Sequence, residues 1–244
     1  MKNINIIAMA GMGRRFKEKN IKTFKPLYLY KRKPIFYYAV KSLPKSNNII
    51  FVCTNKDLKK YKLINIIKSY FKKSSICKLK KKTKGQAITC RAAIKNISNN
   101  EFVTFGSCDY SYSFNELKFK NLIKISDLII FVNKPTSENL LNTDQYGWVK
   151  RGSGNEVLKI ECKKLASTKP KKDYVIVGAF SFKSKSVFTA SFNEMLKKRE
   201  IINNEYYMDT LAKHSLKLGF RVSMIKVSKY QNLGTPESIL RYEK

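Results

Sequence analysis

Short apolar runs alternate with amphipathic stretches along the first half of the chain. Four runs are almost wholly apolar and end at glycine or polar residues: NINIIAM (3–9), NIIFVCT (48–54), EFVTFGS (101–107) and DLIIFVN (127–133). Runs of this length without alternation are typical of strands buried on both faces of a sheet. Between them, apolar residues recur at helical spacing in residues 33–43, 56–71 and 85–97. This order predicts an α/β fold.

The pattern changes after about residue 145. Residues 145–164, QYGWVKRGSGNEVLKIECKK, read as a hairpin that turns at Gly152–Gly154. A long strand (173–182), two helices (187–199 and 204–218), another strand (220–227) and a last helix from Pro236 complete the chain. No repeat or low-complexity linker divides it. We therefore predict a single domain, 1–244, with a mainly parallel central sheet and the hairpin as a small insertion over one face.

Composition narrows the class of protein. The hydrophobic content of 43% is that of a globular chain, and no apolar run reaches the ~20 residues that span a bilayer. The five cysteines are scattered without a CxxC pair, which is typical of reduced thiols. We expect a cytoplasmic protein without membrane contact. The single histidine, His214, falls inside an expected helix and is interpreted as structural.

The net charge of +33 suggests nucleic acid or an anionic membrane as a partner. The cations are mostly lysines spread over the whole length, and only Lys78–Lys84 forms a cluster. Nucleic-acid grooves favour clustered cations with exposed aromatic residues between them. We interpret most of the charge as a solvated surface that can attract anionic substrates.

A glycine loop follows the first expected strand. Gly11 and Gly13 leave the backbone N–H groups accessible to a phosphate, and Arg14, Arg15 and Lys25 supply positive charge. Ligands of open α/β sheets bind at this end of the strands. The loop lacks the third glycine of a dinucleotide fingerprint and the GK[ST] ending of a P-loop, so a plain tight turn remains an alternative.

The surrounding residues extend this signal. AGMGRRF with FKPL resembles the signature of the sugar-1-phosphate nucleotidylyltransferases, in which a G-x-G-x-R-[LF] loop precedes K-P-L. In that family's order follow TKGQAIT (83–89), similar to its base-reading loop, and VTFGSCDYSY (103–112), similar to its metal-binding strand. YGWVK (146–150), STKP (167–170) and YQNLGTPESILRYE (230–243) resemble its sugar pocket, its E-K-P segment and its closing W-x-D-x-G-T-P segment. The motifs span nearly the whole chain.

The resemblance implies a Rossmann-like three-layer sandwich and a Mg²⁺-dependent reaction. A nucleoside triphosphate and a sugar 1-phosphate would give a nucleotide sugar and pyrophosphate. Arg15 and Lys25 would be catalytic, and Asp109 and Asn232 would bind the metal. The nucleotide would contact Ala10, Gly11, Gly13, Arg14, Gly85 and Gln86, and the sugar phosphate would contact Tyr146, Gly147 and Lys169. Trp148 is as well explained by core packing, and Cys108 by burial.

Two residues depart from the family pattern. Asn232 stands where many relatives have a second metal-binding aspartate, and Asp209 is an alternative ligand. Thr168 replaces the glutamate that commonly binds a sugar hydroxyl, so the resemblance leaves the sugar open. The form MAGMG and the N-x-G-T-P ending are similar to a subgroup that serves capsule and surface-polysaccharide synthesis. Neither the base nor the oligomeric state follows from these residues.

Other classes of function stay open at this point. One is a basic nucleic-acid-binding protein, which would show a steep salt dependence on heparin. Another is a non-catalytic relative that senses nucleotides. This alternative stays open because Asn232 departs from the family's metal-binding aspartate. A nicotinamide dehydrogenase is disfavoured because KPLYLYKRKP (25–34) offers no acidic ribose-binding residue at the required distance.

Overall fold

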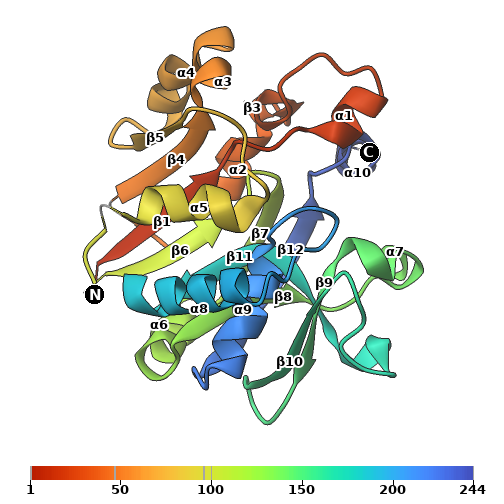
Figure 1. Cartoon of the computed structure of the whole chain (residues 1–244). Helices are drawn as coiled ribbons and strands as arrows, with labels where there is room; N and C mark the ends of the chain where they lie inside the picture. The colour runs from red at the N-terminus through yellow and green to blue at the C-terminus, as the bar shows by residue number, and fades with distance from the viewer. Residues whose placement is uncertain (1, 47, 96, 100, 244) are drawn as a thin grey trace.

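A computed structural model describes residues 2–46, 48–95, 97–99 and 101–243. Its centre is a mixed sheet with the strand order β5-β4-β1-β6-β11-β8-β12-β7 (Figure 1). The strands are β1 (Asn3–Ala8), β4 (Asn48–Thr54), β5 (Ser75–Leu79), β6 (Phe102–Gly106), β7 (Tyr110–Phe114), β8 (Leu128–Asn133), β11 (Tyr174–Phe182) and β12 (Val222–Asn232).

The predicted α/β fold with a mainly parallel sheet is confirmed. β5, β4, β1 and β6 run parallel, and β12 runs parallel to β8. β11 is antiparallel to both β6 and β8, and β7 is antiparallel to β12. The carboxyl ends of β1 and β6 therefore meet at one edge of the sheet, which is where ligands of such sheets bind.

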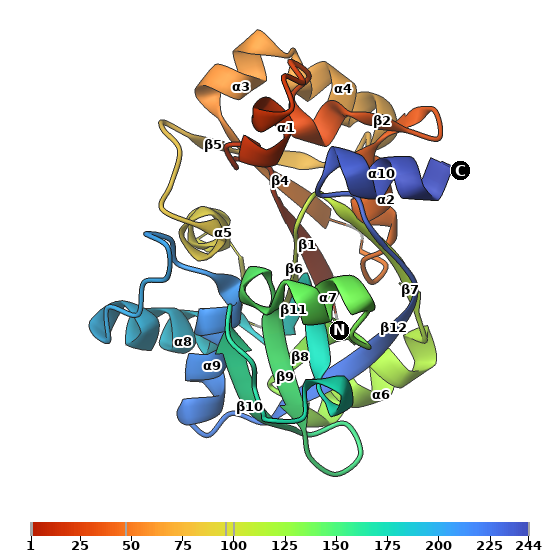
Figure 2. The ribbon, with the colours of Figure 1, turned by 90° about the vertical axis from the view of Figure 1, so that its right-hand side faces the viewer.

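Helices cover both faces of the sheet and give the expected three layers (Figures 1 and 2). In β1, Ile4 and Ile6 pack into one apolar cluster, whereas Ile7 packs into the cluster on the opposite face. The first cluster includes α5 (Gln86–Ile94), α8 (Lys185–Lys197) and α9 (Met208–Lys217). The second includes α2 (Ile35–Lys41), α3 (Asn55–Lys60), α4 (Leu63–Tyr70) and α6 (Glu116–Ile125).

The hairpin predicted after residue 145 is β9 (Gly147–Arg151) and β10 (Val157–Cys162). β9 also pairs with β11, through Trp148↔Val175 and Val149↔Tyr174, so the hairpin is hydrogen-bonded to the main sheet. Trp148 is fully buried against Ala166 and Val175, as core packing predicts. The pairing fixes the first residues of the hairpin beside the end of the sheet.

Two helices differ from the predicted boundaries. The amphipathic stretch 56–71 forms two helices, α3 and α4, because Lys62 adopts a left-handed conformation with φ of +49°. The helix expected from residue 204 begins only at Met208, so residues 204–207 form a loop.

The remaining elements are short. They are α1 (Arg14–Glu18), α7 (Ser137–Leu141), α10 (Pro236–Glu243), the 3₁₀ turns η1 (Lys25–Leu27), η2 (Thr143–Gln145) and η3 (Pro170–Lys172), and the two-stranded β2 (Leu29–Tyr30) and β3 (Lys33–Pro34). α1, α10 and the β2–β3 hairpin share a small apolar cluster around Phe16, Tyr30 and Ile239. Of the helices in the described residues, none is both long and apolar enough to cross a membrane.

Candidate functional site

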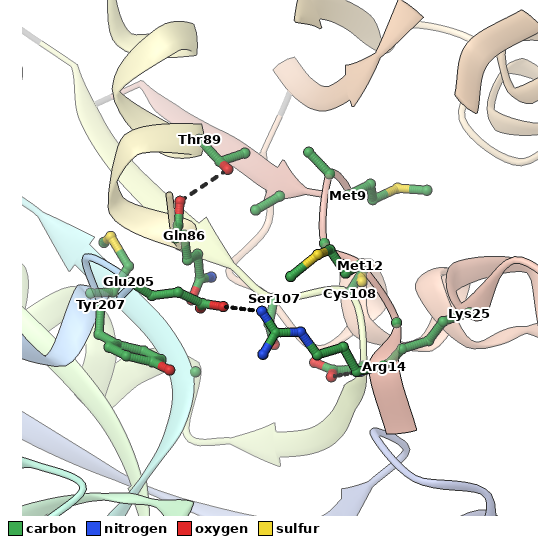
Figure 3. A pocket seen from close by; sticks show the side chains of 18 of the residues that line it. Met9, Met12, Arg14, Lys25, Gln86, Thr89, Ser107, Cys108, Glu205 and Tyr207 are labelled. Atoms are coloured by element: carbon green, nitrogen blue, oxygen red, sulfur yellow. Dashed lines mark hydrogen bonds and ion pairs between the residues drawn. The ribbon is translucent and has the colours of Figure 1, made fainter. Parts of the chain in front are cut away.

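A cavity of about 450 Å³ opens at the carboxyl ends of β1 and β6. Its walls come from segments far apart in the sequence: the glycine loop, η1, the start of α5, the residues after β6, the start of β9 and the loop before α9. Figure 3 shows Gln86 and Tyr207 on one side of it and Lys25 on the other. The sheet topology thus gathers four of the predicted motifs around one space: the glycine loop with its K-P-L segment, TKGQAIT, the residues after β6 and YGWVK.

The glycine loop forms one wall. Ala10, Gly11, Gly13 and Arg14, which were predicted to contact the nucleotide, line the cavity, and so does Arg15, which was predicted to be catalytic. Gly13 has a φ of +62°, which favours glycine, and it is the residue before α1. Arg14 is largely exposed and lies 3.9 Å from Glu205 on the opposite wall (Figure 3). The loop therefore contributes two arginines, Arg14 and Arg15, to the lining of the cavity.

Lys25 and Asp109 form an ion pair at the floor. Lys25 Nζ lies 2.5 Å from Asp109 Oδ2, and both side chains are largely buried. Burial alone would raise the pKa of Asp109, but the charge and hydrogen bond of Lys25, followed by Arg15 and Ser107, outweigh it and lower that pKa. Asp109 is therefore a carboxylate at neutral pH, and two predicted catalytic cations act on it.

Asn232 lies beside this carboxylate. A Cβ built on Gly234 would lie 2.8 Å from Asn232 Oδ1 and 3.0 Å from Asp109 Oδ2, so both oxygens border the same space. The backbone holds them there, since Leu233 N–H donates to the Asp109 carbonyl (2.8 Å) and Gly234 N–H donates to Asn232 Oδ1 (2.9 Å). Asn232 itself is buried behind the cavity wall.

These oxygens fit a hard divalent cation. Carboxylate and amide oxygens are ligands that Mg²⁺ accepts. Within the described residues, no group of three or more His, Cys, Asp or Glu side chains is placed to hold a metal ion, so substrate or water would have to complete the shell. The assignment of Asp109 and Asn232 to a metal stays a prediction.

Asp209 lines the cavity, whereas Asn232 does not. Its carboxylate packs against Gly147, and the Cys162 thiol donates a hydrogen bond to it. Burial raises the pKa of Asp209 to about 6, although the nearby Lys163 charge lowers it. This placement puts the alternative metal ligand next to the predicted sugar pocket.

The start of α5 forms the wall predicted to contact the base. Gly85 has a φ of +104°, and any Cβ there would clash with the backbone of Tyr206, so packing alone requires this glycine. Gln86 lines the cavity, and its buried Nε2 has no hydrogen-bond partner among the described residues. An unpaired buried donor is costly unless a ligand accepts from it. Gln86 is therefore a stronger candidate than Gly85 for a residue that contacts the base.

The predicted sugar pocket is only partly assembled as expected. Tyr146 and Gly147 line the cavity, and the Tyr146 hydroxyl lies 3.4 Å from Glu138 Oε1. Lys169 is exposed at the start of η3 and does not line the cavity. Lys163 lines it instead, with Nζ 3.3 Å from the Gln145 carbonyl oxygen.

The sequence reasoning missed several of the lining residues, among them Lys82, Lys163, Glu205 and Tyr207. The predicted hairpin could have pointed to Lys163. Its register pairs Cys162 with Gly147, so Lys163, which follows Cys162, lies beside Tyr146. Lys82 lies in the Lys78–Lys84 run and reaches to 3.5 Å from the Gly11 carbonyl oxygen. One member of that run therefore belongs to the cavity.

Two other reactive side chains agree with their structural interpretation. Burial raises the pKa of Cys108 to about 12, so its thiol is protonated at neutral pH. His214 is buried in α9 away from the cavity lining, with Nε2 2.9 Å from Glu200 Oε2. Cys108 thus lines the cavity as a protonated thiol, and His214 lies outside the lining.

Known proteins share the fold of this chain. A family described as nucleotidyl transferase matches residues 4–244. Among solved structures, a nucleoside-diphosphate-sugar pyrophosphorylase from Vibrio cholerae RC9 superposes with a TM-score of 0.80 at 18% identity, covering 98% of each chain. A UDP-glucose pyrophosphorylase in complex with UDP-glucose gives 0.75 at 16% identity, covering 99% of this chain and 97% of that one.

A third structure, the inositol-1-phosphate CTP transferase from T. maritima, gives a TM-score of 0.71 at 14% identity over 97% of this chain and 91% of its own. No curated protein sequence matches the chain. At these identities the structures show a common fold, whereas the family match covers almost every residue. The chain belongs to the nucleotidyl transferase family.

Proposed function

We propose that this protein joins a nucleoside triphosphate to a sugar 1-phosphate, or to a similar phosphorylated small molecule, and releases pyrophosphate. The observation that carries the proposal is the convergence of five cations on one cavity beside a buried carboxylate: Arg14, Arg15, Lys25, Lys82 and Lys163. Two polyanionic reactants repel each other, and fixed cations offset that repulsion.

In this reaction an oxygen of the acceptor phosphate attacks the α-phosphorus of the triphosphate. The new P–O bond forms as the bond to the β-phosphate breaks, and pyrophosphate leaves. No general base is needed because the attacking oxygen is already ionised. Arg15 would hold the triphosphate and the leaving pyrophosphate, and Lys25 would lie between the attacking phosphate and the α-phosphate.

Mg²⁺ fits the oxygens of Asp109 and Asn232, and when bound it would neutralise phosphate charge. Lys25 already holds Asp109 as a carboxylate, which keeps a negatively charged ligand available. On the base side, the free Nε2 of Gln86 would donate to a ring acceptor. We further propose that the reaction takes place in the cytoplasm and supplies nucleotide sugars for surface polysaccharides.

A substrate matrix tests the function. Each common nucleoside triphosphate is combined with a panel of sugar 1-phosphates and other small phosphates in Mg²⁺, and pyrophosphate release is followed. We expect release only when both substrates are present and strongest for one pair. Tight binding of a nucleotide with no turnover in any pair would favour the nucleotide sensor instead.

The acceptor site distinguishes two lysines. Lys163 lines the cavity and Lys169 does not, so Lys163→Ala should raise the KM for the acceptor roughly 10- to 100-fold, the loss expected for one charged hydrogen bond to a phosphate. Lys169→Ala should change that KM less than about threefold. Steady-state kinetics on both variants show which lysine binds the acceptor phosphate. A larger rise in KM for Lys169→Ala than for Lys163→Ala would assign that role to Lys169.

Asn232→Asp tests the metal assignment. The new carboxylate would keep the acceptor position toward Gly234 N–H and add a negative charge beside Asp109. We expect the Mg²⁺ concentration at half-maximal rate to fall by roughly three- to tenfold, with a small change in kcat. Titration of Mg²⁺ against rate measures it. An unchanged Mg²⁺ requirement would remove residue 232 from the metal and leave Asp209 as the next candidate.

The lysines of the Lys78–Lys84 run should differ in how much their replacement changes the kinetics. Lys78, Lys80 and Lys81 are exposed outside the cavity lining, so their joint replacement by glutamine should leave kcat/KM within about twofold at physiological salt. Lys82→Gln should raise the KM for the triphosphate about three- to tenfold, because Lys82 lines the cavity. Equal effects of the two variants would mean that the run acts only as a diffuse charge.

A further inference from the structure

The acidic residues are distributed along the chain even more unevenly than the cations. Residues 19–100 contain 22 lysines and arginines and one acid, Asp57, whereas the rest of the chain has 28 cations and 16 acids. Asp57 is buried, so its carboxylate does not balance the surface. A lysine-rich composition alone does not explain why acids are missing from one segment.

The charge of this segment is also uncompensated within the described protein. Lys19 and Lys25 are the two of its 22 cations that lie within 4.0 Å of a carboxylate in the described residues. Of the 22 lysines and arginines in residues 19–100, all except Lys25 and Arg91 are exposed. Concentrated like charge destabilises the compact state by self-repulsion and is offset by an external anionic partner.

The β2–β3 hairpin concentrates three of these cations at one tip. Tyr30 pairs with Lys33, and the two-residue turn between them is Lys31 and Arg32, with φ of +44° and +64°. Asn-Gly is favoured in such turns because side chains other than Gly, Asn and Asp are strained at positive φ. The chain thus keeps two cations at this tip, where asparagine and glycine would fold more stably.

Apolar side chains adjoin the cationic tip. Leu29, beside the turn, is 61% exposed, and Ile64 and Tyr70 of α4 are 39% and 37% exposed. A groove of about 570 Å³ lies between the hairpin and α4, and it is lined by Thr23, Leu27, Tyr28, Leu29, Pro34, Ile66 and Tyr70. No carboxylate lines the groove, and it shares no lining residue with the catalytic cavity.

We propose that this face, formed by residues 29–34 and α4, docks on an anionic phospholipid bilayer. Lys31, Arg32 and Lys33 would lie at the level of the lipid phosphates, and Leu29 would insert among the acyl chains. Peripheral membrane binding of this kind combines apolar burial with attraction to anionic lipids. The exposed Leu29 favours a bilayer over nucleic acid, whose phosphates offer nothing for an aliphatic side chain to enter. Docking there leaves the cavity free for substrates.

Vesicle sedimentation tests the proposal on the whole protein. The vesicles are pure phosphatidylcholine or phosphatidylcholine with about a third phosphatidylglycerol, at about 0.1 M salt. The unmodified protein should bind only the anionic vesicles. The triple variant Lys31→Gln, Arg32→Gln, Lys33→Gln should lower the partition coefficient on the order of 100-fold, and Leu29→Ser roughly five- to tenfold.

A matched control exists at the opposite end of the molecule. Lys197, the last residue of α8, and the following Lys198 and Arg199 have the same composition and are exposed. Replacing them with glutamine should change the partition coefficient less than about threefold. Equal losses in the two triple variants would overturn the proposal, as would absence of binding to anionic vesicles.

A second variant separates docking from folding. Lys31→Asn with Arg32→Gly installs favoured turn residues, so it should raise Tm by about 2–4 °C while lowering the partition coefficient roughly 30-fold. A gain in Tm with unchanged vesicle binding would contradict the proposal. The proposal would also be contradicted if the glutamine triple variant lost binding to duplex DNA while Leu29→Ser left vesicle binding unchanged. That pattern would identify nucleic acid as the partner.

Discussion

Asp109→Asn should reduce kcat by about a thousandfold or more, the largest effect expected of any single change in this protein. The substitution removes the charge that holds Lys25 at 2.5 Å and the carboxylate predicted first to bind the metal. The pKa of Asp109 lies below its usual range, so the charge that is lost is present throughout the neutral pH range.

Asp173→Asn provides a matched control for this experiment. Asp173 is also a buried aspartate, it accepts a hydrogen bond from the Ser167 hydroxyl (2.7 Å), and it does not line the cavity. Its replacement should lower Tm and leave the kcat of the folded enzyme within about threefold. Comparable kcat values for the two variants, each confirmed as folded by circular dichroism, would show that Asp109 has only a structural role.

Lys25→Ala and Arg15→Ala should each lower kcat by on the order of 10²–10³-fold, the loss expected for one preorganised charge partner. Lys25→Ala should also move the acidic limb of the pH–rate profile to higher pH. Without Lys25, burial would raise the pKa of Asp109 with less opposing charge, and the carboxylate would protonate earlier as the pH falls.

Lys22→Ala is the control for Lys25→Ala, because Lys22 is an exposed lysine three residues earlier and outside the cavity lining. Steady-state rates between about pH 5 and 9 measure both effects. If Lys25→Ala lowers kcat but leaves the acidic limb in place, the ionisation of Asp109 does not control the rate.

The sequence predicted those features that depend on local pattern and on sheet topology. Buried strands ending in glycine or aspartate placed the Gly11–Gly13 loop and Asp109 at one edge of the sheet, and the cavity lies there. The closing N-x-G-T-P segment placed Asn232, which the structure brings beside Asp109. The position of the glycine loop needed only the rule that parallel strands present their carboxyl ends together, whereas the pairing of Asn232 with Asp109 came from the resemblance to the nucleotidylyltransferases.

The features that were missed depend on contacts between distant segments. Lys163 enters the cavity through the register of β9 and β10, whereas the STKP motif drew attention to Lys169. Glu205 and Tyr207 lie in a loop that periodicity assigned to a helix. The break between α3 and α4 depends on the backbone conformation of Lys62, which no propensity specifies for a lysine.

The stoichiometry of the products tests nucleotidyl transfer most directly. The preferred nucleoside triphosphate and acceptor are incubated with enzyme and Mg²⁺, and ³¹P NMR follows both products. The proposed reaction predicts a nucleotide sugar and pyrophosphate in equal amounts, neither of which forms without the acceptor. Release of inorganic phosphate or pyrophosphate without formation of a nucleotide sugar would contradict it.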